Sequence, residues 1–311
     1  MKHKPQPPNQ LNIALLILTS LANGFLLWWV SHSTDWYLIV IGVIGFALIS
    51  NTLFSLLHEA VHGLLNSKPV VNEWFGRLVA GWFPTSLTIQ RAFHLTHHKN
   101  NRSAEEQFDV LHEDDVKWLK YLQWYSIISG VYWFSTIIGL LLYLLVPSVF
   151  RIKIFESKDS KIAQQTSSSA YFKVFNTIDS VQVKLEILGS ILFQALLFWL
   201  LDLSWWGWLL CYTSFAVYWS ALQYADHAYS ELDPINGAWN LSVSRITRAI
   251  YLNYHYHLAH HQNPDVPWLY LGDYVDDALP QPSFWKVWLT MWWKGPRTEA
   301  ELARVSNSII K

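Results

Sequence analysis

The residues His94-Leu95-Thr96-His97-His98 return almost unchanged later in the chain as His257-Leu258-Ala259-His260-His261. A third cluster, His58-Glu59-Ala60-Val61-His62, and the isolated His227 complete a set of nine histidines. On a helix, positions 0, 3 and 4 span an arc of about 100°. We therefore expect each HxxHH cluster to aim three imidazoles at one point, and HxxxH to aim two.

Nine imidazoles indicate a metal site with more than one ion. Imidazole is the commonest metal-donating side chain near neutral pH, and nine of them exceed what one tetrahedral zinc can use. The economical interpretation is a two-metal site, and imidazole ligands with open positions favour iron. The candidate ligands are His58, His62, His94, His97, His98, His227, His257, His260 and His261.

Long apolar runs indicate an integral membrane protein. Over half of the 311 residues are hydrophobic and only 14% are charged, against roughly 25% in a soluble domain. Since about 20 apolar residues cross the hydrocarbon core of a bilayer, we expect spans at about 11–30, 36–57, 186–203 and 205–224. Tryptophans at the ends of these runs are typical of an interfacial aromatic belt.

Charge and cysteine content exclude other classes of function. The formal net charge is −1, so nothing suggests a nucleic-acid partner. The single cysteine, Cys211, excludes a disulfide framework and a cysteine-ligated iron–sulfur cluster within this chain.

The histidines also constrain the topology. One metal site needs its ligands on one face of the membrane, so an even number of crossings must separate His98 from His227. The last two runs supply two crossings, and the stretch 121–150, interrupted by a Ser-Gly pair, is then an embedded hairpin or crosses twice. The basic segment 151–184 favours the cytoplasmic face. We predict one all-α membrane domain over residues 1–311, with about four spans, and with the N-terminus and a helical cap holding the metals on the cytoplasmic side.

Four further residues are candidates for the surroundings of the metals. Gln223, one turn before His227, could donate an oxygen directly or through water. Asp226 and Asp265 could each orient an imidazole by accepting its N–H. His255 should point away from the face of the helix that carries the ligands, so it could contact a ligand side chain but should not bind a metal itself.

The first cluster has a second interpretation. HEAVH fits the zinc metalloprotease pattern, with His58 and His62 as ligands and Glu59 as general base, which at the end of a span suggests an intramembrane protease. That interpretation leaves the other clustered histidines without a role. Non-catalytic metal transport would need ionisable residues along the spans, where the sequence has few.

The three clusters resemble the HxxxH, HxxHH and HxxHH boxes of the membrane fatty acid desaturase and hydroxylase superfamily. The 31-residue gap between His62 and His94 suits this family, as does an isolated histidine at the end of the last span. The resemblance covers roughly residues 36–275. It implies nine histidine ligands to two ferrous ions, molecular oxygen as oxidant and a hydrocarbon-bearing lipid substrate. Some relatives have an asparagine where this chain has Gln223.

By this resemblance we expect oxidation of an unactivated C–H bond at the diiron centre itself, first of all fatty acyl desaturation or hydroxylation. Two alternatives share the boxes. A carotenoid ketolase or hydroxylase is favoured by the proline-tryptophan segment Pro264–Trp268 after the third box. A decarboxylase that makes terminal alkenes from fatty acids is the other.

The chain has no flavin, haem-attachment or cysteine-rich motif, so a separate ferredoxin- or cytochrome-type electron donor is expected. Its docking surface is predicted to include Lys99, Arg102, Lys117 and Lys120, charges that equally suit a solvated face beside anionic lipid. Basic residues that could meet a substrate carboxylate or phosphate are Arg91, Arg245 and Arg248.

Overall fold

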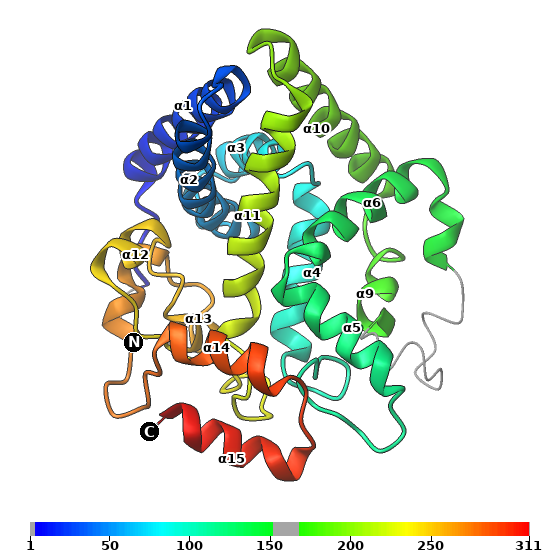
Figure 1. The fold of residues 1–311 in the computed structure, drawn as a ribbon, viewed down its shortest axis with the longest axis vertical. Helices are drawn as coiled ribbons and strands as arrows, with labels where there is room; N and C mark the ends of the chain where they lie inside the picture. The colour runs from blue at the N-terminus through cyan, green and yellow to red at the C-terminus, as the bar shows by residue number, and fades with distance from the viewer. Residues whose placement is uncertain (1–3, 152–167, 311) are drawn as a thin grey trace.

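The computed structural model describes residues 4–151 and 168–310, and these are helical apart from loops and isolated β-bridges (Figure 1). The long helices are α1 (Asn9–His32), α2 (Trp36–His62), α10 (Ser180–Leu200) and α11 (Trp205–Ala225). The shorter elements are α3 (Pro69–Trp82), α4 (Leu87–Asn100), α5 (Lys117–Ile128), α6 (Val131–Leu145), η1 (Pro147–Arg151), α9 (Ser168–Val174), α12 (Arg245–Ile250), α13 (His257–Gln262), η2 (Trp268–Tyr274), α14 (Phe284–Lys294) and α15 (Glu299–Ile310).

Three helices of the described chain are long and apolar enough to cross a membrane, namely α1, α2 and α10. They match three of the four runs expected from the sequence. The fourth run forms α11, which is also 21 residues long but is less hydropathic because it carries several Ser, Thr, Gln, Trp and Tyr side chains. α11 nevertheless packs against both α1 and α2. The bent pair α5–α6 would add a further span if it counts as one.

The long helices place their turns at one end and the histidines at the other. The α1–α2 and α10–α11 turns lie together at the top of Figure 1, whereas α13, α14 and α15 lie toward the opposite end. His62 closes α2, and His227 follows α11 by two residues. The two therefore emerge at the same end of the bundle, as a shared metal site requires.

The hairpin formed by α3 and α4 was not expected from the sequence. At its tip, Trp82 donates from Nε1 to Ser20 Oγ (3.1 Å), and its carbonyl accepts the Tyr212 hydroxyl (2.6 Å). Ser20 and Tyr212 lie within α1 and α11, several turns from the histidine end. The hairpin thus reaches into the bundle, and α4 then returns the chain to the histidine end with the second box.

The predicted break in 121–150 is present. α5 and α6 meet at an angle of 95° across Ser129-Gly130. Gly130 has φ 86°, and a Cβ there would lie 2.8 Å from the carbonyl carbon of Ala216 in α11. At 1.5 Å per residue, α5 and α6 are about 18 Å and about 22 Å long, each shorter than the hydrocarbon core of about 30 Å. Whether this element crosses the membrane stays a prediction.

Two residues predicted for a donor-docking surface are buried instead. Arg102 is 1% exposed and donates to Asp109 Oδ1 (2.5 Å) and to the Ser230 carbonyl (3.0 Å). Lys120 is 4% exposed and donates to the Gln107 carbonyl (2.7 Å). The loop after α4 has no regular secondary structure, so its buried polar groups need side-chain partners. Of the four cations, only Lys99 and Lys117 are exposed.

Candidate metal centre

The nine histidines converge from four parts of the chain into two adjacent groups. The five-histidine group contains His58, His62, His94, His98 and His260. The four-histidine group contains His97, His227, His257 and His261. Within each group the candidate ligand atoms lie within 4.8 Å of one another. The groups touch, since the rings of His98 and His261 have centroids 4.3 Å apart.

Each HxxHH box divides between the two groups, so the expectation that it aims three imidazoles at one point is wrong. In α4, His94 and His98 enter the five-histidine group while His97 enters the other. In α13 the assignment is reversed, because only His260 joins the five-histidine group. Positions i+3 and i+4 differ by about 100° around a helix, which is wide enough to serve two neighbouring centres.

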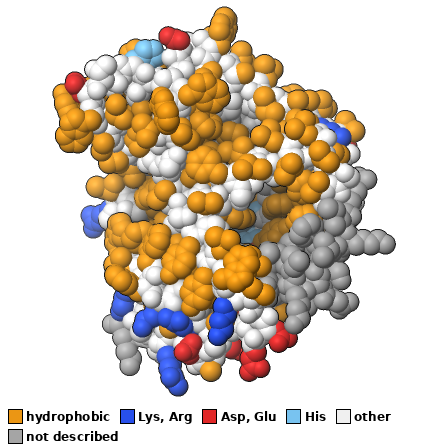
Figure 2. All heavy atoms as spheres, turned by 45° about the vertical axis from the view of Figure 1, so that its right-hand side comes forward, with side chains coloured by type: hydrophobic (Ala, Val, Ile, Leu, Met, Phe, Trp, Pro, Cys, Tyr) orange, Lys and Arg blue, Asp and Glu red, His pale blue; other side chains and the backbone are white. Residues whose placement is uncertain are grey.

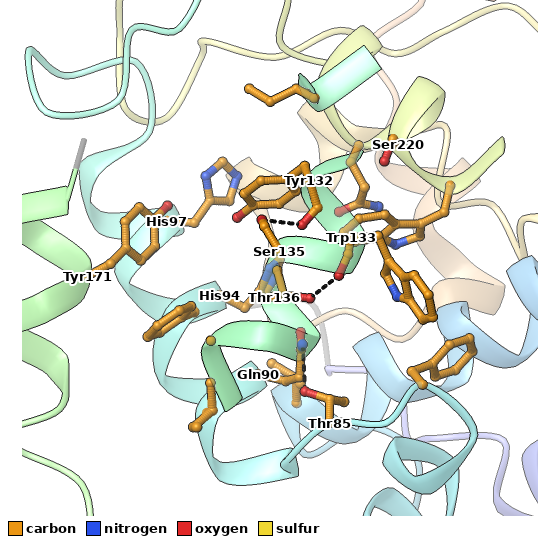
Figure 3. Close-up of a pocket in the computed structure, with 18 of the residues that line it drawn as sticks. Thr85, Gln90, His94, His97, Tyr132, Trp133, Ser135, Thr136, Tyr171 and Ser220 are labelled. Atoms are coloured by element: carbon orange, nitrogen blue, oxygen red, sulfur yellow. Dashed lines mark hydrogen bonds between the residues drawn. The ribbon is translucent and has the colours of Figure 1, made fainter. Parts of the chain in front are cut away.

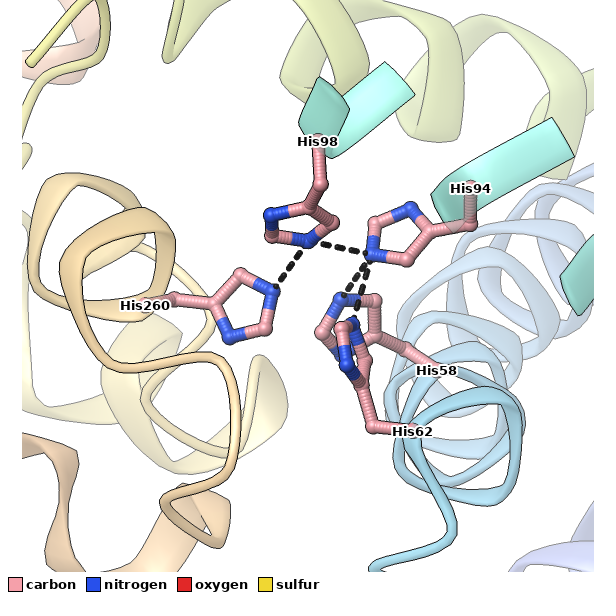
Figure 4. A group of neighbouring side chains, drawn as sticks. All are labelled: His58, His62, His94, His98 and His260. Atoms are coloured by element: carbon pink, nitrogen blue, oxygen red, sulfur yellow. Dashed lines mark hydrogen bonds between the residues drawn. The ribbon is translucent and has the colours of Figure 1, made fainter. Parts of the chain in front are cut away.

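The imidazoles of the five-histidine group face a common point (Figure 4). His94 Nε2 lies 2.8 Å from His62 Nε2, 2.9 Å from His98 Nε2 and 3.0 Å from His58 Nε2. In the other group, His227 Nε2 lies 2.9 Å from His257 Nε2 and 3.1 Å from His97 Nε2. Lone pairs so close together are best satisfied by a shared cation, and this donor set fits iron or another imidazole-binding metal.

Burial keeps most of these imidazoles neutral and therefore able to donate a lone pair. It lowers the pKa of His94, His257 and His260 well below the usual value, and neighbouring histidines lower it further. His97 differs. Burial lowers its pKa, but the Glu106 and Asp226 carboxylates raise it by more, so the net shift is upward.

Partners behind the rings fix which nitrogen faces the centre. His97 Nδ1 lies 3.0 Å from Glu106 Oε2, and the Tyr171 hydroxyl donates to the other oxygen of Glu106. His227 Nδ1 donates to the Gly237 carbonyl (2.9 Å). Such partners orient a ligand and raise its basicity. Sequence reasoning missed Glu106, because a loop separates it from His97 with no fixed helical spacing.

A cavity of about 380 Å³ joins the histidines to an apolar region (Figure 3). Two members of the five-histidine group, His58 and His94, line it together with three members of the four-histidine group, His97, His227 and His257. Away from them its wall is built by α6 and the segments after it, including Leu140, Tyr143, Phe150 and Phe175. The cavity therefore has an apolar part next to the candidate metal ligands, which suits an apolar ligand.

A sequence profile of one family, described as fatty acid desaturase, matches residues 34–290. The chain belongs to the fatty acid desaturase family. No match to a curated protein is found. Membership makes this desaturase-family chain an oxidoreductase of lipid chains, and its apolar helices and histidine groups agree with a metal-binding enzyme of the membrane.

The other residues predicted around the desaturase site lie at different distances from it. Asp226 Oδ2 lies 3.5 Å from His257 Nδ1, and Gln223 lines the cavity. Asp265 is exposed, pairs with Lys4 and borders a second hollow that also reaches His62 and His98. His255 lies outside both groups and packs on Tyr256, with ring centroids 4.0 Å apart.

Glu59, the general base of the protease interpretation, lies behind a ligand ring. Its Oε1 is 4.0 Å from His58 Nδ1, the nitrogen on the outer side of that ring. Its Oε2 accepts the Trp268 backbone N–H (3.2 Å). His58 and His62 also share their group with three further histidines. This geometry gives the protease no support.

Proposed function

We propose that this protein is a membrane-bound diiron oxidase that uses molecular oxygen to oxidise an unactivated C–H bond of a long acyl chain, first of all by desaturation. The five-histidine group would hold one iron and the four-histidine group the other. Bound iron would activate molecular oxygen, the oxidant, which no side chain can do. The observation that carries the proposal is the convergence of nine buried or half-buried imidazoles, five of which line an apolar cavity.

The chain's own residues position the substrate and exclude water. Phe93, Leu140 and Tyr143 line the cavity and would hold an acyl chain in a fixed conformation beside the histidines. Fixed placement matters, because shifts of about 1 Å decide such reactions. Glu106 and Asp226 lie behind His97 and His257, and would keep those rings oriented toward the centre.

Electrons would come from a separate ferredoxin- or cytochrome-type donor. The second hollow, of about 470 Å³, is lined by His62 and His98, which do not line the cavity, and the exposed Lys99 lies on the same helix as His98. We place the donor on the side of this hollow, and we propose that it is the cytoplasmic face, with the whole chain acting as one domain.

Metal analysis and product analysis test the proposal together. Tag-free protein should contain two irons per chain, and His227→Ala should abolish turnover while the protein stays folded. Acyl and pigment profiles of a host that also expresses a ferredoxin should show new double bonds with unchanged carotenoids. Changed carotenoids or terminal alkenes would replace the reaction with one of the alternatives. One zinc that persists when His94, His97 and His98 are changed to alanine would favour the protease.

A further inference from the structure

α5 and α14 together present a broad aromatic surface on the outside of the molecule. Its members are Trp118 (69% exposed), Leu122 (59%) and Tyr125 (37%) on α5, and Trp285 (63%), Trp292 (36%) and Trp293 (82%) on α14. We call these six residues the aromatic platform. Isolated apolar side chains are ordinary on a surface, whereas a contiguous patch of this kind marks an interaction site.

The platform is one rigid surface rather than two separate helices. Trp124 of α5 donates from Nε1 to the Met291 carbonyl of α14 (3.0 Å), and the Tyr125 hydroxyl donates to the Trp292 carbonyl (3.3 Å). The rings of Tyr125 and Trp292 have centroids 6.0 Å apart. Trp124 and Met291 are fully buried, so this joint fixes α14 against α5.

The level of the platform along the bundle follows from the packing of α5. Gly130, two residues after the end of α5, lies so close to α11 that an added Cβ would be 2.8 Å from the backbone of Ala216. Tyr125 is about 7.5 Å from Gly130 along α5, whereas α11 continues about 13.5 Å beyond Ala216 before it ends at Ala225. The place where α14 meets α5 is therefore no farther out than the end of α11. If α11 spans the membrane, as the sequence predicts, a bilayer surface lies at that end.

Basic side chains border the platform. Lys117 on α5 and Lys286 and Lys294 on α14 are exposed beside the aromatic residues. Figure 2 shows hydrophobic side chains over most of this face, with Lys and Arg side chains near its lower rim and Asp and Glu side chains among them. Tryptophan at the level of lipid headgroups, with lysine next to it, is the pattern of a helix that lies in the membrane surface.

We propose that α14, with the outer face of α5, lies in the plane of the bilayer surface and binds anionic lipid headgroups through Lys117, Lys286 and Lys294. α5 then separates lipid from cavity, because Ile127 on the same helix lines the cavity. This inference is independent of the reaction, since it concerns where the bilayer surface lies. It makes α14 a lipid-bound element rather than part of a solvated cap.

The test uses the full chain in vesicles of phosphatidylcholine with phosphatidylglycerol. Cys211 is fully buried, so a cysteine introduced on the surface can be labelled alone with bimane. Trp293→Cys and Leu122→Cys place the label on the platform. Asn307→Cys is the control, because this exposed position is on α15, which lies beyond α14 in Figure 1. We expect lipid-borne nitroxide near the headgroups to quench both platform labels, and aqueous iodide to quench only the control.

A second measurement tests the lysines. Purified protein should retain phosphatidylglycerol over phosphatidylcholine, and K286E/K294E should lose about fivefold of that preference for each lysine. Labels at 293 and 122 that iodide quenches freely in vesicles would overturn the proposal. It would also fail if shielding appeared only after a ferredoxin was added, or only at high protein density, since the platform would then bind a donor or a second copy.

Discussion

Replacing Glu106 by glutamine should weaken metal binding in the four-histidine group alone. Glu106 is 4% exposed and its Oε2 lies 3.0 Å from His97 Nδ1. A hydrogen bond to a charged partner contributes about 1.5–3 kcal/mol, against about 0.5–1.5 kcal/mol for a neutral one. Glutamine keeps the size but loses the charge, so His97 becomes a weaker and less firmly oriented ligand. We expect roughly a 10- to 100-fold loss of affinity for one of two ions.

The assay is a titration of metal-free protein with Fe²⁺ or Co²⁺ against a competing chelator, fitted with two affinities. Tyr171→Phe is the matched control, because it removes the other partner of Glu106 and leaves the His97 contact in place. It should change either affinity by less than the glutamine variant does. Two unchanged affinities in Glu106→Gln, or an equal loss at both ions, would refute the role assigned to this carboxylate.

Three further changes probe the cavity, the hairpin break and the buried ion pair. Gly139→Phe places a phenyl ring in open space at the cavity wall and should reduce turnover roughly 100-fold. Gly189→Phe is the control, because that position is equally free of neighbouring atoms but lies on the outside of α10, and it should leave turnover unchanged. Steady-state rates of the two variants test this. Gly130→Ala must adopt φ 86° and meet the α11 backbone, so the apparent Tm should fall by the equivalent of about 1–3 kcal/mol; an unchanged Tm would mean that α5 packs differently. Arg102→Met leaves Asp109 charged and buried, so the free energy of unfolding, measured in detergent, should fall by about 3–5 kcal/mol. A fall of less than about 1 kcal/mol would show that the pair is not buried.

Local patterns identified much of this protein because their physics is local. Runs of about 20 apolar residues correspond to α1, α2 and α10, since the bilayer fixes the length of a spanning helix. The Ser129-Gly130 pair marked a real break, because glycine alone adopts the left-handed conformation without strain. The histidine boxes indicated metal and family together, since imidazoles in such number have few other uses.

Other features depended on residues distant in sequence. Arg102 was expected on the surface, but its partners Asp109, Tyr224 and Ser230 form a buried pocket that only the folded loop creates. α3 has a sequence that suits a surface helix, yet its C-terminal end is buried between α1 and α11. No periodicity predicts such contacts, because they depend on which helices become neighbours.

The amino-acid order by itself determined the candidate donors, their helical spacing and the apolar segments that bring them to one end of the bundle. Only the tertiary structure decided how nine donors are shared as five and four. α4 and α13 each present neighbouring ring positions to both centres, and the relative placement of two helices 163 residues apart sets which ring belongs to which group. Spacing fixes an angle on one helix; the distance between helices is fixed by packing.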